Sequence, residues 1–596
     1  MAPVNPVKRI PRERGGWWHA YVCPVHGVEL DHGDPLSGSF PEAGARCPHG
    51  CRVDTEDVRA AWTVLSHQAW ARHIRALAER GEDQESARRL TEYAALYAEL
   101  AGQHHDGAQP WMLRGRLFHQ ALTEAIWAVN IGHAAWTLAG RGTDCGAGVL
   151  SLLDELERAA LDARDVLVAR GDLASNYTAW LNAAGTVTGR AAAAVRGMPW
   201  TGAKQWLDGE HGLYAHLRSA VAGDGWEWEG STYYHGFVLR AALLALRGTD
   251  PAQLPLDVTG TLTRMTDVLA AISTDGGVLP ALHDGPYRRP PLALEWLELA
   301  VLAGQFAPSP ALAAIAGRAR AELNGADDGL DRLLDGWFTG RPLPERPAPG
   351  PVTVFEDTGY AVVRAPGIHA VLDFGPHGGS HGHRDKLALY LYGKNTPWQP
   401  DPGQVPYAHA EFRELYASAA AHPAFRVDDT EQHECAGRLL AADARSVTAE
   451  VTRAYDGVRA VRHIETGPAH LVDLLTVTAD DARRVTAQLR PDTPLDVRAT
   501  TGGTLRTTWH GEETLHGWHT ASAPVAVFTR PGPGPADDPQ RTRSRVDLTA
   551  RAERIVFASV YQAASAGPAV TRVRLTGAGL EVQFADGSGS LHRTEC

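Results

Sequence analysis

The sequence predicts a multidomain α+β protein in which an (α/α) toroid is followed by an antiparallel β-sandwich. Three observations favour this order. Apolar residues recur at three- and four-residue steps from about residue 55 to 340, which is typical of helices. A Pro-rich linker, TGRPLPERPAPGPV, then covers residues 339–352. Short β-like runs separated by Gly, Pro, Asp and Asn turns follow it, as expected for a sandwich.

The helical half, residues 55–340, contains amphipathic segments joined by short connections. In SLLDELERAALDARDVLVARG (151–171), Leu152, Leu156 and Ala163 follow the helical period and Gly171 ends the segment. Short connections predict antiparallel pairs, either stacked as a solenoid or closed as a toroid, and the lack of a strict repeat favours the toroid. Similar segments lie at residues 58–80, 84–101, 113–139, 176–196, 202–222, 230–248, 258–273, 292–304 and 310–324.

The β half, residues 351–596, contains runs such as VTVFEDTGYAVVRA (352–365), HAVLDFG (369–375) and LALYLYG (387–393). Their alternation and turn residues predict an antiparallel sandwich. A chain of 596 residues is too long for one hydrophobic core, so separate domains are expected. A cleft between the two domains is the natural ligand site.

The N-terminal segment, residues 1–54, holds a group of cysteines and histidines. CPVHG (23–27) contributes Cys23 and His26, and CPHGC (47–51) contributes Cys47, His49 and Cys51. Thiolates and imidazoles at short spacing favour a small zinc knuckle, although the spacing matches no standard zinc finger. Reduced thiols in a loop are the alternative.

Charge and hydropathy limit the partners. A net charge of −13 argues against a general nucleic-acid binder, and an anionic ligand would need a local basic pocket, which some of the 27 histidines can help to form. No apolar run approaches the roughly 20 residues of a membrane span. The first residues lack the apolar core of a secretory signal, so we expect a cytoplasmic protein without a membrane partner, if the chain is complete. A homo-oligomer stays open.

The stretch GGSHGHRDKLALYLY (378–392) places His381 and His383 on a glycine-rich turn before a predicted strand. Asp401 in WQPDPGQ and His422 in AAAHPAF follow. Two imidazoles and one carboxylate form a good ligand set for zinc, and ligands from three β segments would fasten the sheet. Hydrogen-bonded strand histidines are the alternative.

These segments resemble motifs of the heparinase II/III-like polysaccharide lyases. The similar stretches are HGHRD (381–385), DPGQVPY (401–407) and HPAFRVDDTEQ (422–432), in which HPA replaces the HNT of the family. The resemblance implies an incomplete (α/α) toroid joined to an antiparallel β-sandwich. It also implies that His381 faces the active site, while His383, Asp401 and His422 hold a structural zinc ion.

Two helical segments are similar to the same family. DGWEWEGSTYYHGFVL (224–239) places the catalytic tyrosine at Tyr234, and SNYTAWLNAAGTVTG (175–189) places a substrate-binding amide at Asn176. Tyr177 stands where many relatives have His or Trp. On the residues alone, Tyr234 and its neighbours also fit a packed aromatic belt, and Asn176 fits a helix cap.

The resemblance implies a carbon–oxygen lyase that cleaves uronic-acid-containing glycans by β-elimination and leaves a 4,5-unsaturated sugar. Asn176 would bind the uronate carboxylate. Ser231 is expected to cap a helix whose dipole favours the phenolate of Tyr234. His381 would act across the cleft as base, acid or carboxylate donor. Tyr407 and Tyr416 are reserve candidates for the second proton-transfer group.

Other functions remain open. A glycoside hydrolase on a toroid would need two carboxylates flanking the bond. A cupin-like metalloenzyme would use the HxH motif at an open metal site, and a non-catalytic glycan-binding relative is also compatible with the sequence. The loop LPALHDGPYRR (279–289) either touches substrate through Asp284 and Arg288 or Arg289, or forms a surface ion pair. The carboxylates available for hydrolysis are Asp224, Glu227, Glu229 and Asp284.

Overall fold

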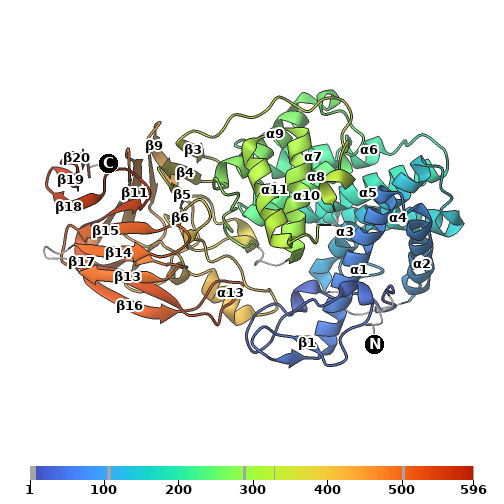
Figure 1. Cartoon of the computed structure of the whole chain (residues 1–596), viewed down its shortest axis with the longest axis horizontal. Coiled ribbons are helices and arrows are strands. Elements are labelled where there is room, and N and C mark those ends of the chain that lie inside the picture. Colours follow the sequence, from blue (N-terminus) through green and yellow to red (C-terminus); the bar gives the residue numbers. More distant parts are fainter. Residues whose placement is uncertain (1–7, 104–108, 286–289, 328, 500–503, 595–596) are drawn as a thin grey trace.

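A computed structural model describes residues 8–103, 109–285, 290–327, 329–499 and 504–594. A helical ring forms one half of the elongated molecule and antiparallel sheets form the other half, with the N-terminal segment beneath the junction (Figure 1). The predicted architecture, a toroid followed by a β-sandwich, is confirmed. Within the described residues, no helix combines the length and apolarity needed to cross a bilayer.

The N-terminal segment has little regular structure and a small core of its own. Tyr21, Cys23, Val28 and Cys47 are buried, and they pack together with Trp62 from the first long helix. The regular elements are η1 (Trp18–Ala20), η2 (Pro35–Ser37), β1 (Ala45–Arg46) and β2 (Arg52–Val53), of which the two strands pair antiparallel.

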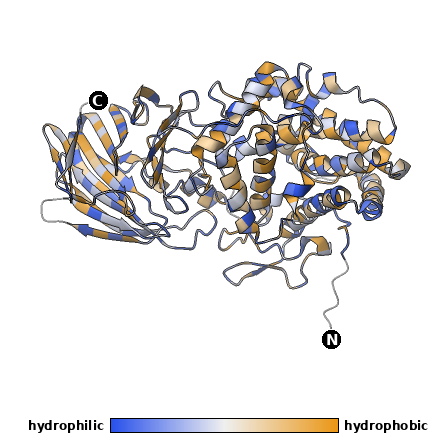
Figure 2. Cartoon of the chain, turned by 45° about the horizontal axis from the view of Figure 1, so that its top comes forward, coloured by the Kyte–Doolittle hydropathy of each residue, from blue (hydrophilic) through white to orange (hydrophobic). Residues whose placement is uncertain are grey.

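The helical ring is built from two rows of helices. In the inner row α1 packs on α3, α3 on α5, α5 on α8 and α8 on α10, while α2, α4, α7, α9 and α11 lie outside. Apolar and polar segments alternate along these helices (Figure 2), and the buried apolar residues of the ring form one large core. The helices are α1 (Glu56–Arg80), α2 (Asp83–Ala101), η3 (Pro110–Met112), α3 (Ala121–Gly140), α4 (Gly146–Arg170), α5 (Asn176–Val195), α6 (Ala203–Trp206), α7 (Leu213–Ala220), α8 (Thr232–Ala245), η4 (Pro251–Gln253), α9 (Leu256–Ile272), α10 (Pro290–Phe306), α11 (Pro310–Leu323) and α12 (Leu330–Leu333).

A buried ion network joins helices that are far apart in the sequence. Glu298 of α10 accepts hydrogen bonds from Arg75 of α1 and, at 2.7 Å, from Nε of Arg240 of α8. All three side chains are at most 6% exposed. A charge is tolerated in this interior because its partners satisfy it, so the network fixes how α1, α8 and α10 meet.

Two predicted helices differ from the structure. The segment predicted at 113–139 begins as a helix only at Ala121, because Glu124 accepts hydrogen bonds from the backbone N–H groups of Arg116 and Leu117 and holds them outside the helix. The segment 202–222 divides into α6 and α7. Gly209 between them approaches the Lys204 carbonyl so closely that no side chain would fit there.

Within its described residues, the β half comprises three antiparallel sheets. A five-stranded sheet has the order β3-β4-β5-β6-β7, a ten-stranded sheet has the path β13-β14-β15-β17-β12-β11-β10-β9 with β8 and β16 at its sides, and β18-β19-β20 form a third. The strands are β3 (Val352–Phe355), β4 (Tyr360–Ala365), β5 (Ile368–Asp373), β6 (Leu389–Tyr392), β7 (Pro397–Gln399), β8 (Phe425–Val427), β9 (Arg438–Ala442), β10 (Ser446–Val451), β11 (Val458–Thr466), β12 (Leu471–Leu489), β13 (Leu495–Ala499), β14 (Leu505–Trp509), β15 (Leu515–Ala521), β16 (Ala526–Gly532), β17 (Arg543–Ala563), β18 (Val570–Thr576), β19 (Gly579–Phe584) and β20 (Gly589–His592).

The five-stranded sheet is buried on both faces. Ala361 and Val363 of β4 join the core shared with the large sheet, whereas Val362 between them packs with Trp226 and Ile272 of the helical half. Successive side chains of a strand point to opposite faces, so the apolar run YAVVRA serves both contacts. This sheet therefore attaches the sandwich to the ring.

Candidate active site and metal site

A cavity of about 600 Å³ lies where the N-terminal segment, the helical ring and the β half meet. The helical ring contributes Asn176, Glu229 and Tyr234 to its lining, and the β half contributes His381, Tyr407 and Arg413. The N-terminal segment adds Trp17, Trp18 and His19. The helix α13 (Ala410–Tyr416) carries Arg413. The cavity thus brings together the three side chains predicted to be catalytic.

Tyr234 lies in the first turn of α8. Ser231 caps this helix by accepting a hydrogen bond from the Tyr234 N–H at 3.4 Å, as predicted. The Tyr234 ring stacks on that of His381, with 4.0 Å between ring centroids, and its hydroxyl lies 2.9 Å from the hydroxyl of Tyr407. The phenol of the helical half therefore meets an imidazole and a second phenol of the β half.

The expected phenolate at Tyr234 is not supported. Burial, together with the nearby charges of Glu229 and Asp284, raises the pKa of Tyr234 well above its usual value. The helix dipole favours an anion only weakly at such a position, whereas desolvation of a buried phenolate is costly. Tyr234 is thus a neutral phenol at neutral pH and a proton donor.

Asn176 begins α5, which Ser175 caps by accepting a hydrogen bond from the Tyr177 N–H at 3.3 Å. Its amide Nδ2 donates to Glu229 Oε2 at 3.3 Å, while its Oδ1 is buried and accepts no hydrogen bond within the described residues. Burial raises the pKa of Glu229, which Asn176 and His381 oppose only in part. This pair offers an amide and a carboxyl group that holds its proton more readily than an exposed one.

His381 lies in η5 (Gly379–His381), the glycine-rich turn, and its side chain is 15% exposed. Its Nδ1 lies 3.1 Å from Asp284 Oδ2 and 2.8 Å from the Tyr407 hydroxyl. Its Nε2 faces Glu229 Oε1 at 3.6 Å. A carboxylate behind one nitrogen thus orients the ring and leaves the other nitrogen toward the cavity.

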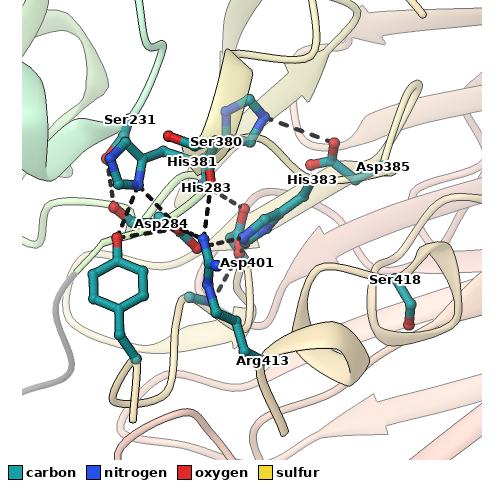
Figure 3. Close-up of polar contacts among 12 residues, drawn as sticks. Ser231, His283, Asp284, Ser380, His381, His383, Asp385, Asp401, Arg413 and Ser418 are labelled. Carbon is teal, nitrogen blue, oxygen red and sulfur yellow. Dashed lines mark hydrogen bonds and ion pairs between the residues drawn. The ribbon is translucent and has the colours of Figure 1, made fainter. Parts of the chain in front are cut away.

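Asp284 lies behind the cavity wall and connects its parts (Figure 3). One oxygen faces His381 and accepts a hydrogen bond from Arg413 Nη2 at 3.0 Å, while the other lies 3.2 Å from His383 Nε2. Burial alone would raise the pKa of Asp284, but hydrogen bonds from His381 and His383 hold it well below its usual range. Asp284 is therefore no surface ion pair, and Arg288 and Arg289 lie outside the described residues.

The three predicted metal ligands come together directly behind Asp284. His383 Nδ1 and His422 Nε2 are 3.0 Å apart, and Asp401 Oδ1 lies 3.7 and 3.6 Å from them. Ligand atoms about 2.0–2.1 Å from a tetrahedral zinc ion would be about 3.3 Å apart, so the set fits the metal. Ser418 O accepts from His422 Nδ1 at 2.8 Å, and Asp284 faces the outer nitrogen of His383. Both are orienting contacts of the kind found around zinc.

Asp385 lies within reach of the same ion as these three ligands and also belongs to an adjoining ion network. The Tyr390 hydroxyl donates to it at 2.5 Å, and Lys386 Nζ lies 3.1 Å from it and 2.7 Å from Asp373. His283 also donates to Asp373, and these two carboxylates raise its pKa to about 10 against the effect of burial. The positive charges in this network balance the acidic groups beside the metal set.

The remaining candidates lie elsewhere. The Tyr416 hydroxyl donates to the Gly534 and Pro535 carbonyls, away from the cavity, whereas Tyr407 is part of the site. Asp224 accepts hydrogen bonds from Thr358 and does not line the cavity. Of the four carboxylates considered for hydrolysis, Glu229 alone lines it. Arg413 was not identified from the sequence, since only the turn of α13 toward Asp284 reveals it.

Known proteins resemble this chain in the sequence of part of its β half and in its whole architecture. Residues 347–526 match the model of the heparinase II/III-like C-terminal domain. This part of the β half is therefore a heparinase II/III-like C-terminal domain. A search among curated proteins found no match.

Solved structures resemble this chain over nearly its full length. A structure of heparan sulfate lyase HepC from Pedobacter heparinus aligns with a TM-score of 0.61 at 14% identity, covering 100% of this chain and 91% of that one. A crystal structure of heparinase III gives 0.62 at 13% identity, with 99% and 93% covered. At these identities the likeness establishes the fold, a toroid with a β-sandwich.

Proposed function

We propose that this chain is a heparinase II/III-like polysaccharide lyase that cleaves a uronic-acid-containing oligosaccharide by β-elimination. One observation carries the proposal: Tyr234 of the helical half and His381 of the β half stack at 4.0 Å beside Asn176, in one cavity. A proton donor, a proton acceptor and an amide for the uronate carboxylate are the groups that this elimination requires.

His381 is the proposed base. Its Nε2 points to the cavity, and Asp284 behind Nδ1 stabilises the imidazolium that forms when the C5 proton is taken. Tyr234, a neutral phenol with a raised pKa, donates its proton to the O4 oxygen as the C4–O4 bond breaks and the C4=C5 double bond forms. Tyr407 touches the Tyr234 hydroxyl and Nδ1 of His381, so it holds the proposed acid and the proposed base next to each other.

Asn176 and Glu229 bind the uronate carboxylate in this proposal. The amide Nδ2 of Asn176 donates to the carboxylate as it takes up the charge of the C5 carbanion, and the buried carboxyl group of Glu229, whose pKa is raised, would add a second donor when it carries its proton. Arg413 adds a positive charge at the cavity wall, in keeping with an anionic oligosaccharide as partner. The heparan sulfate lyase and heparinase III named above have the same fold, which favours a glycosaminoglycan substrate.

Zinc in the set His383, Asp401 and His422 would be structural. When bound, the ion would join three β segments and supply positive charge next to His383. Asp284 contacts both His383 and His381, so the metal set and the proposed base share one carboxylate.

We further propose that the protein acts in the cytoplasm on imported oligosaccharides.

The test is incubation of the purified chain with a panel of uronate oligosaccharides, scored by mass spectrometry and ultraviolet absorbance. Elimination yields products whose summed mass equals that of the substrate, together with the absorbance of the unsaturated uronate. Products that have gained the mass of one water molecule and show no absorbance would instead indicate hydrolysis.

A further inference from the structure

Four side chains of the N-terminal segment converge outside the proposed active site. Nδ1 of His26 lies 3.4 Å from Cys23 Sγ, 3.5 Å from Cys47 Sγ and 3.5 Å from Cys51 Sγ. All four ligand atoms lie within 4.8 Å of one another, and the three cysteines are free thiols. Cys23 and Cys47 are fully buried.

These distances are those of a tetrahedral zinc centre. With Zn–S bonds of about 2.3 Å and a Zn–N bond of about 2.0–2.1 Å, a tetrahedron separates sulfur from nitrogen by about 3.6 Å. The observed separations of 3.4 to 3.5 Å agree with this value. Three thiolates and one imidazole are a common ligand set of structural zinc sites.

Two tight backbone turns position the four ligands. Gly27 N–H donates to the Cys23 carbonyl at 2.9 Å, with Gly27 at a φ of 68°, so His26 folds back over Cys23. In the second turn Gly50 N–H donates to the Cys47 carbonyl at 2.9 Å. The His49 N–H also points at Cys47 Sγ, at 3.4 Å, which favours a thiolate there.

We propose that Cys23, His26, Cys47 and Cys51 bind one zinc ion, separate from the metal set of the β half. The N-terminal segment has a small core and its two strands have two residues each, so a bound metal would stabilise turns that the core alone holds weakly. His49 stacks near His26, with ring centroids 4.8 Å apart, but its Nε2 bonds to Asp538 and it is no ligand.

The proposed ion fastens the N-terminal wall of the cavity to the β half. Gly27 lies directly against the ring of Phe412 in α13, and Gln540 Nε2 donates to the His26 carbonyl at 3.3 Å. The same segment presents His19 edge-on to Tyr407, with ring centroids 4.4 Å apart. Loss of the ion would therefore loosen the wall opposite Tyr407, a consequence that rests on the proposed lyase function.

Zinc content of the purified full-length chain tests the site without reference to activity. Cys47→Ser and His26→Ala should each carry one zinc ion per chain fewer than the unsubstituted chain, whereas Cys145→Ser, a buried cysteine at the start of α4, should carry as many. His26→Cys should retain the ion, because a fourth thiolate replaces the imidazole.

Cobalt substitution separates the two metal sets. Only the N-terminal set contains thiolates, so the thiolate-to-cobalt charge-transfer band should vanish in Cys47→Ser and persist in His422→Ala. An unsubstituted chain without this band, or equal zinc in Cys47→Ser, His26→Ala and the unsubstituted chain, would overturn the proposal. If uronate substrates are cleaved, Cys47→Ser should raise KM several-fold with a smaller change in kcat. A chain that binds zinc here but cleaves no uronate would refute the proposed function alone.

Discussion

At the scale of single residues, one carboxylate organises two sites. Asp284 faces His381 with one oxygen and His383 with the other, at 3.1 and 3.2 Å. It therefore holds the proposed base and the proposed metal ligand at a fixed separation. Because Asp284 is buried and water cannot replace its contacts, a change in His381 or His383 should affect the other histidine.

Removal of the phenol hydroxyl tests the proposed acid. Tyr234→Phe keeps the ring stacked on His381 but leaves no proton for O4, so kcat should fall by about 10²–10⁴-fold with little change in KM. Tyr416→Phe removes another buried hydroxyl that bonds elsewhere and should keep nearly full activity. Steady-state kinetics on the best uronate substrate decide, and an active Tyr234→Phe variant would exclude the assignment.

Asp284→Asn should weaken both sites. An amide cannot accept from two imidazoles, so we expect lower kcat and, by analogy with other carboxylates behind zinc-bound histidines, about 10–100-fold weaker zinc binding. Competition with a chelator measures the zinc affinity. Asp481→Asn, a largely exposed carboxylate, is the control and should change neither quantity. Unchanged zinc affinity in Asp284→Asn would disconnect the two sites.

At the scale of elements, the ion network at Glu298 decides how three inner helices pack. Glu298→Gln leaves Arg75 and Arg240 buried without their counter-charge, so we expect the free energy of unfolding to fall by about 3–5 kcal/mol. Glu85→Gln removes the pairs that the exposed Glu85 carboxylate makes with Arg88 and Arg89 and should cost at most about 1 kcal/mol. Denaturant unfolding compares the two variants.

The same network predicts a pH dependence. Burial opposes ionisation of Glu298, but Arg75 and Arg240 lower its pKa to about 2, from 4.5 for an ordinary Glu. A depressed pKa stabilises the folded state above pH 4.5 and loses that contribution as the pH falls toward 2. The stability difference between the unsubstituted chain and Glu298→Gln should therefore shrink across this window. A difference independent of pH would show that packing, and not charge, is responsible.

Much of the fold could be predicted because periodicity and turn residues are local signals. The predicted helix boundaries were wrong where a side chain binds the backbone, as when Glu124 accepts hydrogen bonds from the N–H groups of Arg116 and Leu117 and keeps them out of a helix. In the site, Tyr234 could be placed by its motif, but its raised pKa could not, because burial depends on the whole packing. Arg413 and the role of Asp284 carry no sequence signal of their own, since both depend on contacts between the two halves.

At the scale of the whole molecule, the β-half metal set should contribute to stability more than to chemistry. Its ligands come from the segment after η5, the DPG turn and the segment after η6 (Ala419–Ala421), so a bound ion would cross-link them. A chelator should lower the melting temperature of the unsubstituted chain and have a smaller effect on His422→Ala. Equal shifts in both proteins would argue against a metal at this set.

The five-stranded sheet makes the stability of each half of the molecule depend on the other half. Cutting the chain at the Pro-rich linker would leave Val362 and Tyr390 on one fragment and Trp226 on the other, each facing water with an apolar patch. Neither fragment is expected to be stably folded and soluble when expressed separately. The intact chain should unfold in one cooperative thermal transition. Although the linker divides the chain clearly in sequence, we expect the ring and the sandwich to fold and unfold together.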